Sequence, residues 1–250
     1  MNAFSLFGSL IGAYRSDARA RQLCNWAFIL SVVFIIATVI VDFVGYVRQM
    51  PMPGYEWIAV YMDQSIPEIF GYGLTLATAI LLLGCYGRFS VRMFVFWAVF
   101  FLFAVLDDAF FYHEYVGAIL VERLNLPALH GLRAQDTGEL LAWAIVAVAL
   151  IVPFAWSLLE RHPGTWAVFF TYSVVLAGFI VFGIGVDMLH EFFGGKVKRV
   201  LNWVEDGGEL LVQSAAFSIA LLLYRFEGSP FQGKSAVPSV AHSMDTRTAR

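Results

Sequence analysis

Six long apolar stretches dominate the sequence, at about residues 25–46, 68–86, 94–113, 138–159, 166–188 and 206–224. Each has roughly the 20 residues that an α-helix needs to cross the ~30 Å hydrocarbon layer of a membrane. None shows the alternation of apolar and polar residues that is typical of barrel strands. Only 14% of the residues are charged, against ~25% in an average soluble domain. The sequence therefore predicts an all-α, polytopic membrane bundle of about six transmembrane helices.

The apolar stretches divide the chain into three parts. We expect a cytoplasmic N-terminal segment at 1–22, a six-helix transmembrane domain at 23–226 and a disordered cytoplasmic tail at 227–250. Lys and Arg near the span ends slightly favour both termini on the cytoplasmic side of a bacterial inner membrane. The lipid bilayer is then the main partner. No basic stripe indicates a nucleic-acid partner, and the oligomeric state is left open.

Acidic residues gather in one half of this topology, and some of them lie deep in it. The stretch LDDAFFYHE (106–114) ends the third apolar run, and most of the 19 acidic residues share its side. By helical rise, Asp107 lies roughly 20 Å from the start of its span, and Glu209 roughly 24 Å from the end of its own. An unpaired carboxylate at such depth costs at least ~2.5 kcal/mol. We therefore expect these side chains to face one another inside the bundle.

Two motifs in the second half of the chain are similar. QDTGELL (135–141) opens the fourth run and EDGGELL (205–211) opens the sixth. A His–Glu pair closes the preceding run in each case, at 113–114 and at 190–191. This similarity predicts a tandem helical-hairpin repeat formed by the third and fourth spans and by the fifth and sixth. The two halves would be residues 94–159 and 166–224.

Simpler roles are available for part of this acidic set. Asp136 and Asp206 could be N-caps of the fourth and sixth spans, where the helix dipole favours a carboxylate. The same explanation fails for Asp107, for Asp187 and for the His–Glu pairs, which are expected at helix C-termini. Lys and Arg in the external loops could neutralise the acids nearest the surface, but not Asp107.

The combination of carboxylates and imidazoles also predicts a metal site. Such groups, projected from four helices, resemble the ligand set of di-iron and di-manganese bundles. Mixed oxygen and nitrogen ligands suit Zn, Fe or Mn. Asp107 and Asp187 would act as catalytic residues, as a proton relay or as partners behind the ligands. The predicted metal ligands are His113, Glu114, Glu139, His190, Glu191 and Glu209.

Three functions fit such a site. A metal-dependent enzyme would activate water or dioxygen against a lipid or other apolar substrate, with a carboxylate as general base. A transporter would use the same acids for protons or cations. A non-catalytic assembly factor is the third possibility. The cytoplasmic halves of the spans are almost purely apolar, which favours a one-sided site and therefore an enzyme or a metal-binding protein. The enzyme would be a metal-dependent hydrolase or oxidoreductase.

At LDDAFFYHE and at VEDGGELL (204–211) the chain resembles uncharacterised bacterial multi-span proteins with LDD…HE and EDG signatures. The resemblance covers roughly the third to the sixth span. It implies a membrane fold and no particular reaction.

Overall fold

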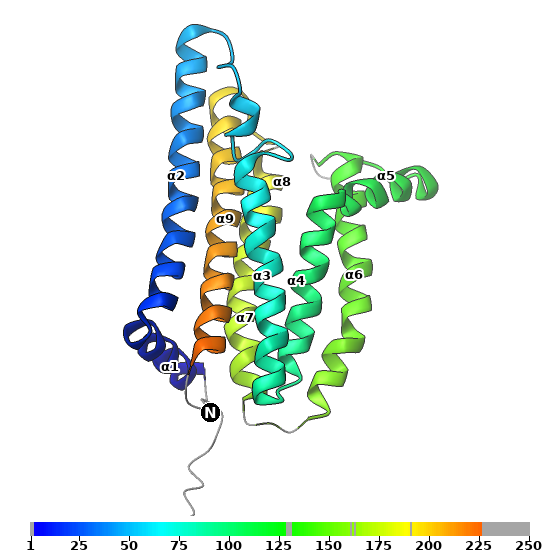
Figure 1. Ribbon diagram of the computed structural model, residues 1–250. Helices are drawn as coiled ribbons and strands as arrows, with labels where there is room; N and C mark the ends of the chain where they lie inside the picture. The colour runs from blue at the N-terminus through cyan, green and yellow to red at the C-terminus, as the bar shows by residue number, and fades with distance from the viewer. Residues whose placement is uncertain (1–2, 129–131, 161, 163, 191, 227–250) are drawn as a thin grey trace, which may run out of the picture.

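The computed structural model describes residues 3–128, 132–160, 162, 164–190 and 192–226. Within these residues the chain is a helical bundle in which six helical segments are long and apolar enough to cross a membrane. This confirms the predicted all-α fold with six spans (Figure 1). The spans are α2 (Ala18–Arg48), α3 (Ile66–Phe89), α4 (Met93–Phe110), α6 (Ala134–Leu158), the segment Thr165–Leu189 and α9 (Gly195–Arg225).

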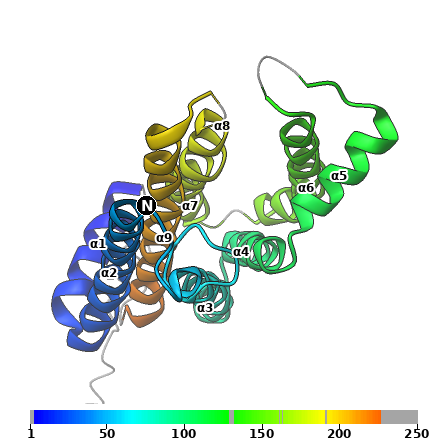
Figure 2. The same cartoon turned by 90° about the horizontal axis from the view of Figure 1, so that it is seen from above.

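Helix α9 is the centre of the bundle. It packs against α2, against α3 and against α7 (Thr165–Phe179). More than half of the residues in its apolar part are buried. Lipid tails are as apolar as leucine, so the hydrophobic effect does not drive helices together in a membrane. Small polar residues do so instead, because they allow close approach and form hydrogen bonds between helices. The hydroxyls of Ser31 on α2 and Ser214 on α9 lie 2.8 Å apart. Figure 2 shows α2, α3 and α7 arranged around α9.

Aromatic rings fill the space between α4 and α7. Trp97 and Phe101 are at most 1% exposed, and each ring centroid lies 5.7 Å from that of the fully buried Tyr172. Edge-to-face and tilted ring pairs of this kind add to the packing energy of a core. The half of α4 that holds Trp97 is therefore solidly packed on its α7 side.

Two helices lie outside the spans, at opposite ends of the bundle. Helix α1 (Ala3–Ser16) packs on α2, α7 and α9, so the predicted N-terminal segment is helical. Helix α5 (Tyr112–Leu124) crosses the other end at a steep angle to the spans (Figure 1). It touches α6 backbone to backbone, because a Cβ built on Gly138 would lie only 2.4 Å from the carbonyl oxygen of Gly117.

The third span ends earlier than its hydropathy predicts. Helix α4 stops at Phe110, and Phe111 takes a left-handed conformation with φ 54° that turns the chain into α5. His113 and Glu114 therefore lie in the first turn of α5 and not at the C-terminus of a span. The expectation that the dipole disfavours an anion at Glu114 was wrong, since a first helical turn favours it.

The sixth span begins earlier than predicted. Helix α9 starts at Gly195, so EDGGELL (205–211) lies in its interior, whereas QDTGELL (135–141) lies in the first turns of α6. Asp206 is consequently not an N-cap. Because the two motifs occupy different positions in their helices, the tandem repeat stays a prediction.

The fifth span changes its winding near one end. After α7 the chain forms a π-helix, η2 (Ile180–Val186), and then the short helix α8 (Asp187–His190). π-Helices are rare, and they are frequently found at functional sites. Gly183 lies in this segment directly against Glu209 of α9, since a Cβ there would be within 3.2 Å of its carboxyl carbon. The predicted tail, 227–250, lies outside the described residues.

Candidate functional site

A large cleft opens along one side of the bundle. It has a volume of about 1270 Å³ and lies between α4, α6, α7 and η2. Figure 2 shows α6 standing apart from α7 and α8 on this side. The end of the cleft near the α6–α7 connection is apolar, and its aromatic residues are Phe96, Trp97, Phe100, Phe154 and Phe169.

The opposite end of the same cleft is polar. The residues that line it come from α4, α5, α6, α8 and α9 and are mostly acids. The cleft is therefore amphipathic along the membrane normal, apolar over most of its length and charged at one end. Its polar residues are Asp107, Asp108, His113, Glu114, Arg133, Gln135, Glu139, Asp187, Glu205 and Glu209.

A smaller polar chamber adjoins this end. It has a volume of about 130 Å³ and lies between α3, α9, the start of α5 and the loop before α3. Its polar and aromatic lining consists of Tyr61, Asp63, Glu68, Tyr72, Asp108, Phe111, His113, Glu114, Asp206, Glu209 and Gln213. Cleft and chamber share a wall, formed by Asp108, Phe111, His113, Glu114 and Glu209.

Asp107 and His113 form a pair at this wall. The Asp107 carboxylate is 1% exposed and accepts two hydrogen bonds from His113, one from the backbone N–H and one from ring Nδ1, both at 2.9 Å. The left-handed turn at Phe111 makes this possible, because it folds the start of α5 back over the last turn of α4. With Nδ1 held by a carboxylate, Nε2 is the ring nitrogen left for chemistry.

The surroundings of His113 act on its pKa in opposite directions. Burial is the largest single influence and lowers the pKa, whereas the hydrogen bond and charge of Asp107 raise it. Glu139 and Asp108 raise it further, so that the pKa of His113 lies above its ordinary value. Neighbouring carboxylates thus favour the imidazolium form.

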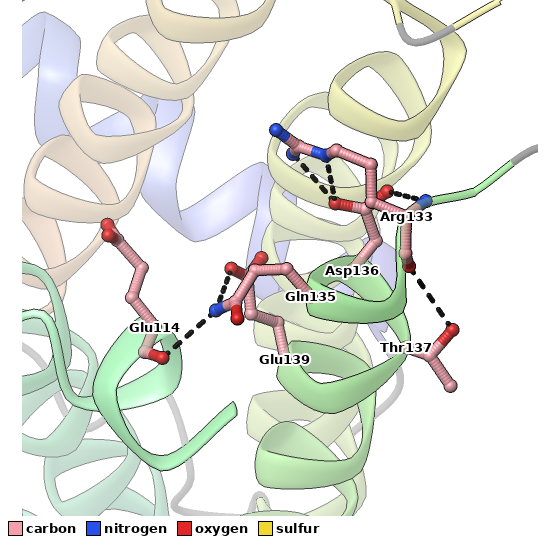
Figure 3. Close-up of polar contacts among 6 residues, drawn as sticks. All are labelled: Glu114, Arg133, Gln135, Asp136, Thr137 and Glu139. Carbon is pink, nitrogen blue, oxygen red and sulfur yellow. Dashed lines mark hydrogen bonds and ion pairs between the residues drawn. The ribbon is translucent and has the colours of Figure 1, made fainter. Parts of the chain in front are cut away.

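Gln135 ties α5 and α6 together beside this pair. Its Nε2 donates to the backbone oxygen of Glu114 at 3.0 Å and to Oε1 of Glu139 at 2.8 Å (Figure 3). Gln135 therefore holds the Glu139 carboxylate and the backbone of Glu114, but not the Glu114 side chain. The Glu139 carboxylate keeps one oxygen that does not take part in this bond.

Asp136 has a structural role at the start of α6. Its carboxylate accepts from the backbone N–H of Arg133 at 2.8 Å and from the Arg133 guanidinium at 2.7 and 2.9 Å (Figure 3). Arg133 is the N-cap and Asp136 is the third residue of the helix, so the prediction of Asp136 as the N-cap was wrong, although its carboxylate does bind the start of the helix. An acid in this position satisfies an N–H that the helix leaves unpaired.

The loop before α3 covers the chamber and is fastened to α2 and α9. The backbone N–H of Val60 donates to Thr38 Oγ1 at 3.0 Å. Asp42 accepts from the Tyr61 hydroxyl at 2.5 Å and from Trp203 Nε1 at 2.7 Å. Burial, and then the hydrogen bond and charge of Asp42, raise the pKa of Tyr61, so its hydroxyl stays protonated and can donate. Asp42, an acid within a span, is thereby satisfied.

Sequence reasoning did not name Tyr72 or Gln213, which line the chamber, as site residues. The Tyr72 hydroxyl donates to Glu68 Oε1 at 2.5 Å and lies 3.3 Å from the carbonyl oxygen of Asp108. Gln213 on α9 is only 7% exposed and lines the chamber. One signal was available, because Gln213 follows Glu209 by four residues, on the same helix face, in an otherwise apolar run.

The structure brings together most of the predicted site residues. His113, Glu114 and Glu209 lie on the shared wall, and Asp107, Glu139 and Asp187 line the cleft. Glu191 and the side chain of His190 lie outside the described residues. Among the side chains that are described, no three His, Cys, Asp or Glu lie close enough together to hold a metal ion. The metal site stays a prediction.

Comparison with known proteins places this arrangement in a family. No curated protein and no solved structure matches the chain. The model of a family described as a domain of unknown function (DUF8692) matches residues 58–224. The match runs from the loop over the chamber to the end of α9 and covers both cleft and chamber. Because it includes well over half of the chain, this protein belongs to the DUF8692 family.

Proposed function

We propose that this protein is a membrane enzyme that acts on a lipid or another long apolar molecule. The substrate would enter the cleft from the bilayer and react at the polar end, next to His113 and the neighbouring carboxylates. The observation that carries the proposal is the amphipathic cleft itself, apolar along α4, α6 and α7 and acidic at one end.

The form of the cleft supports a lipid-like ligand. Drug-sized ligands bind in pockets of ~300–1,000 Å³, and this cleft is larger, at about 1270 Å³. Phe100, Phe154 and Phe169 line its apolar end, where an acyl or alkyl chain would lie. A polar group joined to that chain would lie among charged side chains. The two ends of the cleft thus match the two ends of an amphiphile.

The Asp107–His113 pair supports chemistry in addition to binding. A buried carboxylate that fixes an imidazole is the arrangement by which His acts as a general acid or base. His113 could give or take a proton at Nε2, while Asp107 holds the ring and stabilises its charged form. Glu139 and Glu209 lie on either side as further acids or bases, and both face the cleft.

Zn, Fe or Mn is the proposed cofactor on ligand chemistry alone. His113 Nε2 and the carboxylates of Glu114 and Glu209 are its nearest candidates for ligands. Among the described residues, no three such side chains lie close enough together to hold the ion. Elemental analysis tests this part of the proposal separately.

We further propose that the polar end of the cleft faces the outside of a bacterial inner membrane, with both termini in the cytoplasm. Arg88 and Arg92 in the α3–α4 turn and Arg225 at the end of α9 lie together at the other end of the bundle. Basic residues at span ends favour the cytoplasmic side. Labelling of single cysteines in the two sets of loops with an impermeant reagent on intact cells tests the orientation.

Lipid capture by the purified full-length protein tests the main proposal. The protein is extracted in mild detergent, and its bound lipids are identified by native mass spectrometry. Ala147 lines the cleft from α6, so Ala147→Trp fills part of it. Val148 is the next residue, 65% exposed and not part of the lining, and Val148→Trp is the matched control.

We expect wild type and Val148→Trp to retain lipid and Ala147→Trp to lose it. Incubation with the retained lipid class should then give a product that His113→Gln does not form. Equal retention in all three proteins would contradict a cleft-bound ligand. Retention without a product, together with charge movement in proteoliposomes, would favour a transporter instead of an enzyme.

A further inference from the structure

The chamber adjoins the polar end of the cleft, and the two spaces share a wall. Asp108, His113 and Glu209 line both spaces. At ~30 Å³ per water molecule in the liquid, the 130 Å³ of the chamber hold about four waters or one small polar group. A headgroup that reaches the chamber from the cleft would have to pass this wall, which the side chains of Asp108, His113 and Glu209 help to form.

The charge of the chamber selects the sign of that headgroup. Six acids line it, and His113 is the one basic side chain among the described residues of its lining. Glu68 already accepts from Tyr72 and from the backbone N–H of Gln64. For Asp108, Asp206 and Glu209 no basic partner lies within ion-pair distance in the part of the chain that the structure describes. A cationic group would supply the missing partner.

Gln213 gives an independent indication that the chamber binds something. It is 7% exposed, it lines the chamber, and none of the side-chain hydrogen bonds found among the described residues involves its amide. The amide is not among the fully buried polar atoms that lack a partner, so it reaches the open space of the chamber. Its place is fixed from behind, because a Cβ on Gly71 would lie 2.2 Å from its Oε1. A ligand that donates hydrogen bonds would satisfy this amide, one helical turn from Glu209.

The lining favours an organic cation over a bare metal ion. Tyr61, Tyr72 and Phe111 bring aromatic rings to the chamber, and the faces of such rings attract ammonium groups. A hard metal ion would need three or more closely spaced ligands, and the described side chains do not provide that spacing. Carboxylates, an amide and aromatic rings around one small volume are suited to an alkylammonium group.

We infer that the chamber binds the ammonium group of a cationic amphiphile, whose apolar chain lies in the adjoining cleft. This names the substrate class of the proposed enzyme and rests on the proposed use of the cleft. Glu209 and Asp108 balance the charge at the shared wall, and Gln213 accepts one ammonium hydrogen. The headgroup thereby places the first bonds of the chain beside His113.

The test compares two ligands that differ only in the headgroup. A brominated long-chain alkylamine and the brominated alcohol of the same chain are titrated into full-length protein in lipid nanodiscs. Trp97 and Trp143 line the cleft, so a bound brominated chain quenches tryptophan fluorescence. The variants are Glu209→Gln and Gln213→Leu, with Glu122→Gln and Gln22→Leu as controls at exposed positions.

We expect the amine to bind roughly tenfold more tightly than the alcohol, which corresponds to about 1.4 kcal/mol. In each chamber variant the affinities for amine and alcohol should differ by no more than roughly threefold. Both control variants should keep the full tenfold difference of the wild type. Tetramethylammonium, which is soluble and has no chain, should displace the amine and leave the alcohol bound.

The outcomes separate the two proposals. Equal affinity of amine and alcohol in the wild type would overturn the ammonium site and leave the cleft as a neutral-lipid site. Quenching by neither ligand would overturn the cleft, and the inference with it. Displacement of the amine by Zn²⁺ or Mn²⁺, with stoichiometric metal retained in the wild type and lost in Glu209→Gln, would make the chamber a metal site instead.

Discussion

Asp107 holds both the backbone and the ring of His113, through two hydrogen bonds of 2.9 Å from a carboxylate that solvent does not reach. One side chain thus ends α4, starts α5 and orients the imidazole between cleft and chamber. Structure and chemistry depend here on the same two oxygens.

We predict that Asp107→Asn lowers the pKa of His113 from above to below its ordinary value of 6.5. The charged acceptor is lost, while burial, which lowers the pKa, remains. NMR titration of the ring in selectively labelled protein measures this.

Because the folded pKa of His113 in the wild type is raised, its pairing with Asp107 adds stability that is fully present below pH 6.5 and lost as pH rises through the folded pKa. A melting temperature that falls over this pH window in the wild type, and does not fall in Asp107→Asn, is the expected result. Unchanged titration in the variant would contradict the pairing.

Gly138→Ala should destabilise the protein by about 1–3 kcal/mol, the usual cost of an overpacked contact. The new methyl group would meet the backbone of α5 at 2.4 Å, and a backbone cannot rotate away. Thermal unfolding in detergent measures the loss. Gly73→Ala is the matched control in α3, where a Cβ meets nothing within 4 Å, and Ala there should be neutral or stabilising by up to ~1 kcal/mol. Equal effects at the two positions would show that α5 can move away from α6.

Gly183→Ala should impair ligand binding with little loss of stability. The added Cβ would collide with the carboxylate of Glu209, but this is the end of a flexible side chain and can move. Moving it takes the acid out of the shared wall. We expect a several-fold weaker binding of the brominated amine. The free energy of unfolding should change by no more than about 0.5 kcal/mol, as for a neutral surface substitution. A large stability loss with normal binding would contradict this assignment of Glu209.

Protein purified without chelator should contain stoichiometric Zn, Fe or Mn if the predicted metal site exists. The Glu139→Gln/Glu209→Gln double variant should lose it, since carboxamides are poor ligands for these ions. Glu56→Gln/Glu122→Gln removes the same charge outside the cleft and is the control. Elemental analysis by mass spectrometry decides the question. Absence of metal from the wild type would leave the acids as proton-handling or ammonium-binding groups.

Hydropathy was enough to predict the six spans, because a membrane admits few alternatives to continuous helices. The predicted end of the third span and the predicted start of the sixth span were wrong, each for its own reason. Composition does not report a backbone turn, and the left-handed residue at Phe111 is an aromatic residue, without the usual glycine signal. The amphipathic start of α9 likewise continues a helix beyond its apolar part, from Gly195.

The structure brings several of the predicted site residues to one cleft, together with others that sequence reasoning did not name. Reasoning from the cost of burying charge found Asp107, His113 and Glu209, which all line the cleft. It missed the part that depends on tertiary contacts. Asp42 accepts hydrogen bonds from Tyr61, which is 19 positions away in the sequence, and from Trp203, which is 161 positions away. No local pattern indicates such contacts. Gln213 was missed because a single amide in an apolar helix is usually a packing contact.

The side opening of the cleft has a consequence for kinetics. Ile151 on α6 and Ile180 on η2 flank the cleft and are 57% and 49% exposed, so both face the acyl chains of surrounding lipid. A ligand that arrives through this opening diffuses in two dimensions, and its supply is set by its mole fraction in the bilayer. Occupancy of the site should then stay constant when more vesicles of the same composition are added. It should fall when the ligand is diluted with inert lipid.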